Sequence, residues 1–146
     1  MIFNKEPNLF FQKFWTAAGV MLCDGKILIL FRSETSQQPL TWCLPGGKRD
    51  EQNLETVSKT VSRETEEETG IFIPTWEWTY LETFFVRYPN VDFRFSMFLR
   101  IFEEIPRVCI SDEHLGFAWV PLRSVHRYPL IPELLQCLDI VTKKIP

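Results

Sequence analysis

The sequence predicts an α+β fold in which a mixed β-sheet packs against two helices. Runs of branched and aromatic residues recur between turn signals, which is typical of strands. Two other stretches, one mid-chain and one near the C-terminal end, have the composition or apolar spacing of helices. A chain of 146 residues with 45% hydrophobic content can bury one core, so we expect residues 1–146 to form a single domain.

The first part of the chain predicts a hairpin followed by a short strand. Residues 14–22 and 26–33 are apolar and flank Cys23-Asp24-Gly25, and Asp-Gly is a strong hairpin signal because both residues tolerate positive φ. We expect these strands to pair antiparallel. The short run TWCL at 41–44 ends at Pro45-Gly46-Gly47, where proline and glycine break regular structure.

A helix of about four turns follows over residues 56–69. Asn53 and Thr56 are both suitable N-caps, and Gly70 stands where a left-handed residue would end the helix. Beyond it, residues 76–88 and 92–102 form a predicted long hairpin around Pro89-Asn90-Val91. Residues 117–120 form one more predicted strand, and residues 133–144 a second helix with basic residues in its last turn.

Composition and charge exclude several classes of function. A net charge of −3 gives no electrostatic reason to expect a nucleic acid polymer or an anionic membrane as partner. The longest uncharged stretch near the start, residues 14–23, is half of the about 20 residues that span a bilayer. Lys5, Glu6 and Pro7 interrupt any secretory signal, so we expect a cytoplasmic protein. No C-x-x-C spacing occurs, which predicts reduced thiols at Cys23, Cys43, Cys109 and Cys137.

An acidic cluster on the first helix carries the chemistry of this sequence. Glu64 shares one side of the helix with Glu67 and Glu68, which are three and four positions away. Such a cluster is either a solvated surface or a site of hard oxygen ligands for Mg²⁺ or Mn²⁺. Ser62 and Thr65 stand where a second apolar face would be, which indicates that packing did not shape this helix and favours the metal site.

The segment around this cluster resembles the Nudix box. Residues 46–71 read GGKRDEQNLETVSKTVSRETEEETGI, and the box is a glycine, a later glutamate and then R-E-U-x-E-E-x-G-U, with U aliphatic. Two departures stand out: seven residues rather than five separate Gly47 from Glu55, and Thr65 replaces the aliphatic residue. Neither removes a carboxylate. The positions that match the family spacing are Glu55, Arg63, Glu64, Glu67, Glu68, Gly70 and Ile71.

The resemblance implies an α/β/α sandwich with a mixed sheet between helices. It also implies metal-dependent hydrolysis of a nucleoside diphosphate linked to another group, by attack of water on phosphorus. Glu64, Glu67 and Glu68 would be metal ligands, one of them also a base, and a backbone carbonyl of Gly46 or Gly47 would complete the metal shell. By the same resemblance, Arg63 would orient the carboxylates, Glu55 would tie the loop to the helix, and Glu113 would add an acidic ligand or base.

Residues outside the box give weaker signals about substrate. Arg32 and Lys48 are expected either to face phosphate or to have ordinary surface roles. Tyr88 lies near the tyrosine of dinucleoside polyphosphate hydrolases but also fits a strand end, whereas Phe85 replaces the proline associated with ADP-ribose hydrolases. His114 and His126 have no partner at a metal-ligand spacing, so we expect surface or capping roles for them.

The leading hypothesis is a Mg²⁺-dependent nucleoside triphosphate pyrophosphohydrolase, including one for oxidised nucleotides, with Mn²⁺ as an alternative metal. The small size of the chain resembles that branch of the family. A dinucleoside polyphosphate hydrolase and a catalytically silent, nucleotide-sensing module are the alternatives, since a fold does not guarantee activity. No Cys and Glu pair demands an isoprenoid diphosphate isomerase. The partner is expected to be a small molecule, with the protein a monomer or a homodimer.

Overall fold

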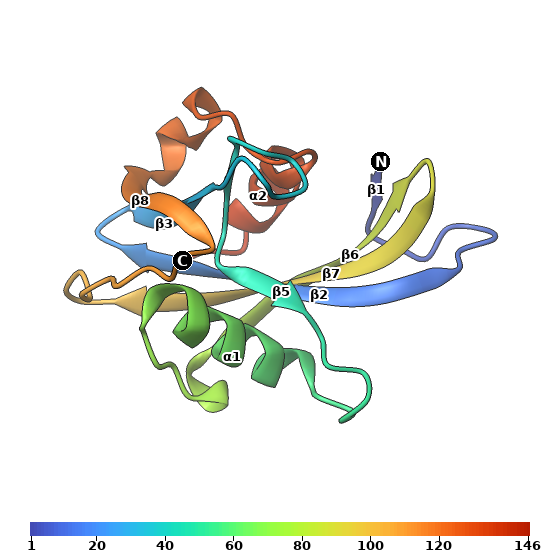
Figure 1. Ribbon diagram of the computed structural model, residues 1–146, viewed down its shortest axis with the longest axis horizontal. Coiled ribbons are helices and arrows are strands. Elements are labelled where there is room, and N and C mark those ends of the chain that lie inside the picture. Colours follow the sequence, from blue (N-terminus) through green and yellow to red (C-terminus); the bar gives the residue numbers. More distant parts are fainter.

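A computed structural model describes residues 1–146 and contains an eight-stranded mixed sheet with an α-helix on either face (Figure 1). The α+β prediction is therefore confirmed. The helices are α1 (Val57–Thr69) and α2 (Leu134–Thr142), with short 3₁₀ turns η1 (Thr75–Glu77) and η2 (Leu122–Arg127). The strands are β1 (Ile2–Phe3), β2 (Gln12–Cys23), β3 (Lys26–Arg32), β4 (Trp42–Cys43), β5 (Gly46–Lys48), β6 (Thr79–Tyr88), β7 (Val91–Phe102) and β8 (His114–Pro121).

The long strand β2 organises the sheet. The strand order is β1-β6-β7-β2-β3-β4, while β5 pairs with β2 and β8 pairs with β3. The β2–β7 pairing is parallel and the other pairings are antiparallel, so the sheet is mixed. The expected turn joins β2 to β3, with Asp24 and Gly25 both at positive φ. Figure 1 shows that β1, β2, β6 and β7 extend beyond both helices at one end.

Each face of the sheet carries its own hydrophobic core. The larger cluster of 16 buried residues includes the inward side of α2, and the smaller one of 10 includes Val61 of α1. Trp78 belongs to the smaller core and lies directly over Gly19, where an added Cβ would fall 2.5 Å from the ring. The glycine therefore lets the indole approach the backbone of β2.

Helix α1 has the predicted caps, but its polar residues take part in packing. Thr56 caps the N-terminus by accepting a hydrogen bond from the Lys59 amide, and Gly70 ends the helix in the left-handed conformation. The interpretation that packing did not shape this helix is wrong for Ser62 and Thr65, because both side chains are buried. Ser62 Oγ donates to the Ile73 carbonyl at 2.7 Å and accepts from Trp78 Nε1 at 2.9 Å, so Ser62 packs through hydrogen bonds.

The other differences from the predictions are several element ends and two strands that were not predicted, β1 and β5. Strand β5 runs through Gly46 and Gly47, where a break in regular structure was expected. Residues 76–77 belong to a 3₁₀ turn rather than to β6, and β8 begins at His114 instead of at residue 117. The basic residues expected in the last turn of α2 begin at Lys143, just after its end. All four cysteines are free thiols, as expected. None of the helices has the length and apolar character needed to cross a membrane.

Candidate active site

A cleft of about 820 Å³ lies beside the glycine-rich strand β5. Its polar part contains Gly46, Gly47 and Glu68. Its apolar part contains Phe14 and Phe93, whose rings stack 4.8 Å apart. This volume and this combination of a few polar groups with an aromatic wall are those of a small-molecule site.

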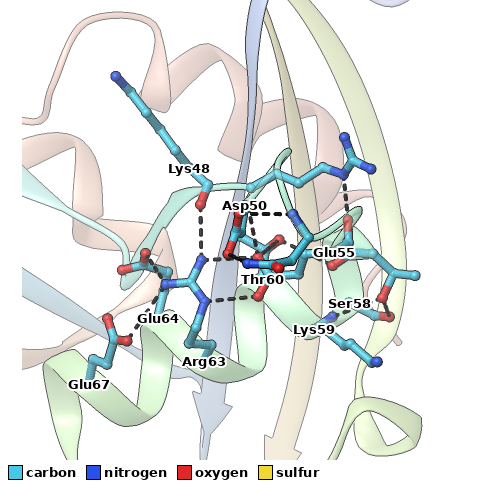
Figure 2. Close-up of polar contacts among 12 residues, drawn as sticks. Lys48, Asp50, Glu55, Ser58, Lys59, Thr60, Arg63, Glu64 and Glu67 are labelled. Atoms are coloured by element: carbon cyan, nitrogen blue, oxygen red, sulfur yellow. Dashed lines mark hydrogen bonds and ion pairs between the residues drawn. The ribbon is translucent and has the colours of Figure 1, made fainter.

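Arg63 gathers three of the acidic residues at the outer part of the site (Figure 2). Its guanidinium donates two hydrogen bonds to Glu55, at 2.8 and 3.0 Å, and a third to Glu64 at 2.8 Å. Its Nη1 is also 3.6 Å from the carboxylate of Glu67, and its Nη2 donates to the Lys48 carbonyl. The bidentate pairing fixes the planar guanidinium, which in turn fixes the direction of Glu64.

The two extra residues before α1 are absorbed in a compact turn. The Asp50 amide donates to Glu55 Oε1 and the Glu55 amide donates to the Asp50 carbonyl, so the ends of the turn are joined. The Asn53 side chain donates to Asp50 at 2.7 Å. Leu54 in this turn has positive φ and its side chain is exposed. The insertion therefore extends outward and leaves Glu55 in contact with Arg63, as expected for a tolerant surface loop.

A second acidic group lies deeper, around Glu68. Its Oε1 accepts from the Gly46 amide at 2.8 Å, and its Oε2 lies 4.0 Å from His114 Nε2. Donor atoms of Glu68, Glu113 and His114 all lie within 4.8 Å of one another. Burial raises the pKa of Glu68 to about 8, because the charged carboxylate loses its hydration. Burial also raises the pKa of Glu64.

The two glycines of β5 are required for different reasons. A Cβ on Gly47 would fall 2.4 Å from the carboxyl carbon of Glu64, so the absence of a side chain provides the space for that group. A Cβ on Gly46 would fall 2.3 Å from the Ala17 carbonyl of the adjacent strand. Gly47 is thus required by the position of Glu64, while Gly46 is required by the sheet itself.

The residues expected to bind substrate lie around the cleft. Arg32, Lys48 and Tyr88 all line it. Arg32 donates from Nε and Nη2 to the Gln37 carbonyl, and the Lys48 ammonium lies 4.4 Å from the centre of the Phe14 ring. Tyr88 is half-buried, and its hydroxyl donates to the Pro132 carbonyl at 3.5 Å. Phe85 does not line this cleft.

The sequence reasoning missed His114 of the deeper group and its neighbour Cys43. The expected surface role for His114 is wrong, because the residue is buried and faces Glu68. Cys43 is also buried, with its sulfur 3.8 Å from His114 Nε2 and 3.9 Å from Arg32 Nη1. Burial raises the pKa of the Cys43 thiol to about 11. These residues are far apart in sequence and meet because β4 and β8 both pair with β3.

The family model of the NUDIX domain matches residues 13–139, which include the whole Arg63 network and the deeper group around Glu68. The chain belongs to the Nudix hydrolase family. Its Nudix box is the segment from β5 to the C-cap of α1, so the motif found in the sequence is the segment that builds the acidic site.

Solved structures show the same fold. A MutT Nudix hydrolase from Burkholderia pseudomallei is 28% identical, with a TM-score of 0.73 over 88% of this chain and 97% of that chain. The Nudix domain of Shewanella oneidensis NrtR, complexed with ADP ribose, is 23% identical, with a TM-score of 0.76 over 98% and 95% of the two chains. A Caenorhabditis elegans Ap4A hydrolase is 22% identical, with a TM-score of 0.72 over 90% and 96%. None of the curated protein sequences matches this chain.

The Nudix site has the donor set of a divalent metal centre. Glu64, Glu67, Glu68 and Glu113 offer the hard oxygen ligands that Mg²⁺ and Mn²⁺ prefer. Glu68 is buried with a single backbone donor, so a cation would offset the loss of hydration that raises its pKa. Of the acidic side chains, however, only Glu68 and Glu113 belong to a close group of donor atoms, whereas Glu64 and Glu67 contact Arg63.

Proposed function

We propose that residues 1–146 form one Nudix domain that hydrolyses a nucleoside diphosphate linked to another group, most simply a nucleoside triphosphate. One observation carries the proposal: the buried, box-derived Glu68 opens into a large cleft whose other wall is aromatic. The aromatic part suits a nucleobase, because Phe14 and Phe93 offer ring surface for stacking. The polar part suits the phosphates.

The residues of the site have separate proposed roles in positioning, phosphate binding and metal binding. Gly46 holds Glu68 through its amide, and Glu55 holds Arg63, which holds Glu64. Arg32 and Lys48 bring positive charge to the cleft for the phosphate oxygens, and Glu113 stands at the exposed side of the deeper group. Mg²⁺ or Mn²⁺ bound by Glu64, Glu67, Glu68 and a backbone carbonyl of Gly46 or Gly47 would neutralise phosphate charge and acidify the attacking water. Water adds to one phosphorus, the anhydride bond breaks, and a nucleoside monophosphate leaves with the matching phosphate product.

A second candidate is a dinucleoside polyphosphate hydrolase. The observation that favours it is Tyr88, which is half-buried at the aromatic part of the cleft and contacts Phe93 edge to face. A second base could stack there in addition to the first. Replacing Tyr88 by Leu would then raise the KM for dinucleoside polyphosphates more than the KM for nucleoside triphosphates.

The test is a substrate panel of nucleoside triphosphates, oxidised nucleotides, dinucleoside polyphosphates, nucleotide sugars and ADP-ribose. The purified protein is incubated with each compound and Mg²⁺ or Mn²⁺, and the products are separated by chromatography. Glu67→Gln and Glu68→Gln are expected to abolish turnover. Glu66→Gln is the matched control, because Glu66 is an exposed acid on the same helix outside the site. Binding without turnover across the panel would contradict the hydrolase proposal and favour the alternative of a catalytically silent, nucleotide-sensing module.

A further inference from the structure

Thr60 is a buried residue of α1 whose hydroxyl reaches the Arg63 network from the interior. It lies at the end of the first turn of the helix and is 0% exposed. Its Oγ1 lies 2.7 Å from Glu55 Oε1 and 3.1 Å from the carbonyl oxygen of Thr56. Figure 2 shows Thr60 together with Glu55 and Arg63. The hydroxyl therefore contacts the network at one atom, the Oε1 of Glu55.

Of these two contacts, the one with Glu55 takes the hydroxyl proton. A threonine hydroxyl has a single proton to donate. The Glu55 carboxylate accepts two hydrogen bonds from Arg63, so it is ionised and has no proton to offer in return. The Thr56 carbonyl already accepts from the Thr60 amide at 3.0 Å. The shorter bond to a charged acceptor is the stronger of the two, so Thr60 is a donor to Glu55.

Glu55 depends on this donor because the chain that leads to it is exposed. Residues 51–54 are all exposed, in a turn two residues longer than the family pattern. Oε1 of Glu55 accepts two further bonds, from the Asp50 amide at 3.1 Å and from Arg63 Nη2 at 3.0 Å. The Asp50 amide belongs to the turn itself, and the long side chain of Arg63 is 35% exposed. Thr60 supplies the donor that is held in the interior, on a stiff β-branched side chain.

We propose that Thr60 is a positioning residue for the hydrolysis, because it fixes Glu55, which fixes Arg63, which directs Glu64. Arg63 Nη1 donates to Glu64 at 2.8 Å, so a displacement of Glu55 reaches Glu64 through one planar guanidinium. Thr60 does not line the cleft, so its effect on substrate is indirect. The effect on rate rests on the proposed function, whereas the chain of hydrogen bonds can be measured without substrate.

The first experiment measures kcat and KM of Thr60→Val, which keeps the side-chain shape and removes the hydroxyl. Loss of a bond that supports a site residue from behind costs about 10–100-fold in activity, and we expect the lower end, about tenfold in kcat with little change in KM. Thr60→Ser keeps the hydroxyl and should restore most of the lost rate. Thr65→Val is the matched control, because Thr65 is equally buried on the same helix and its hydroxyl has no hydrogen-bond partner.

The second experiment follows the Arg63 Nε–H group by NMR in ¹⁵N-labelled protein without substrate. Its bond to Glu55 Oε2 at 2.8 Å should slow exchange of this hydrogen with water in the parent protein. Exchange should be several-fold faster in Thr60→Val and unchanged in Thr65→Val. In a Glu55→Gln background, where the chain is already broken, Thr60→Val should lower kcat by less than about a further twofold.

Circular dichroism and the unfolding temperature establish that each variant is folded, and Thr60→Ala replaces Thr60→Val if the latter does not fold. The proposal is overturned by parent-like kcat or parent-like Arg63 exchange in the folded variant, by an equal loss in Thr65→Val, or by a loss that Thr60→Ser does not restore. If the parent protein turns over no compound of the panel, the proposed function fails. The Arg63 exchange rates then still decide whether Thr60 holds the network.

Discussion

The two helices pack on opposite faces of one sheet in different ways. Helix α2 buries Leu134, Leu138 and Val141 with Cys137, an apolar set that joins the larger core. Helix α1 buries one aliphatic residue, Val61, and otherwise polar side chains: Thr60, Ser62, Thr65, Glu68 and Thr69. Burying polar groups costs free energy unless they are hydrogen-bonded. The comparison teaches that α2 stabilises the sheet by packing, while α1 is held by directional bonds that also aim its carboxylates.

The largest change in stability is expected from the packing helix. Leu138 is 1% exposed and lies outside the cleft, so Leu138→Ala leaves a cavity in the larger core. We expect a loss of about 2–5 kcal/mol in the free energy of unfolding, measured by urea denaturation, with unchanged activity per folded molecule. Reduced specific activity of the folded fraction would show that α2 also shapes the site.

Gly47→Ala should reduce activity while leaving stability nearly unchanged, the reverse of Leu138→Ala. The new Cβ displaces the flexible end of Glu64 rather than backbone, so stability should change little while the carboxylate moves. A displacement of about 1 Å is expected to reduce kcat about 100-fold. Gly116→Ala is the control, since nothing lies within 4 Å of an added Cβ there. Equal loss of activity in both variants would contradict the assigned role of the Gly47 space.

The directional bonds of α1 can be broken at Ser62. Ser62→Ala leaves Trp78 Nε1 and the Ile73 carbonyl without their buried partner. Stability should fall by about 1–3 kcal/mol, measured by chemical denaturation. Ser58→Ala, which alters a less buried serine on the same helix, should cost far less. Similar losses in the two variants would contradict the assigned contribution of the buried hydrogen bonds of Ser62.

The Glu55–Arg63 pair should make the free energy of unfolding depend on pH. Hydrogen bonds from Arg63 lower the pKa of Glu55 to about 2, below its usual 4.5, so the folded state favours the carboxylate. This contribution is complete above the unfolded pKa and is lost as the pH falls through 4.5 towards 2. Glu55→Gln should cost about 1–2 kcal/mol at pH 7, after allowance for the partly exposed Arg63. The difference in free energy of unfolding between the parent protein and Glu55→Gln, measured by denaturant titration, should shrink at acidic pH. A difference that stays constant with pH would contradict the link between the Glu55 pKa and stability.

The smallest expected effect is a gain in stability, from a substitution at Thr65. Thr65 is fully buried and its hydroxyl has no hydrogen-bond partner, although its position in the Nudix box is aliphatic. Thr65→Val keeps the shape and removes the unpaired group, so stability should rise by up to about 1 kcal/mol, which corresponds to about 3 °C in Tm. A decrease in Tm in differential scanning calorimetry would show that the hydroxyl has a partner in solution.

The sequence by itself determined the local features. Asp24-Gly25 set the first hairpin, Thr56 and Gly70 set the ends of α1, and the spacing from Glu55 to Glu68 identified the Nudix box. These signals are local because turns, caps and helix faces depend on residues a few positions apart.

Tertiary structure alone decided which side chains meet across the sheet. His114 and Cys43 join Glu68 because β4 and β8 pair with β3, and no spacing along the chain encodes that neighbourhood. The burial of the polar face of α1 could not be predicted from the sequence either. The partners of Ser62 are the Ile73 carbonyl and Trp78 Nε1, which lie beyond the end of the helix. A serine pattern shows where polar groups lie on a helix, but only packing determines whether protein atoms or water will satisfy them.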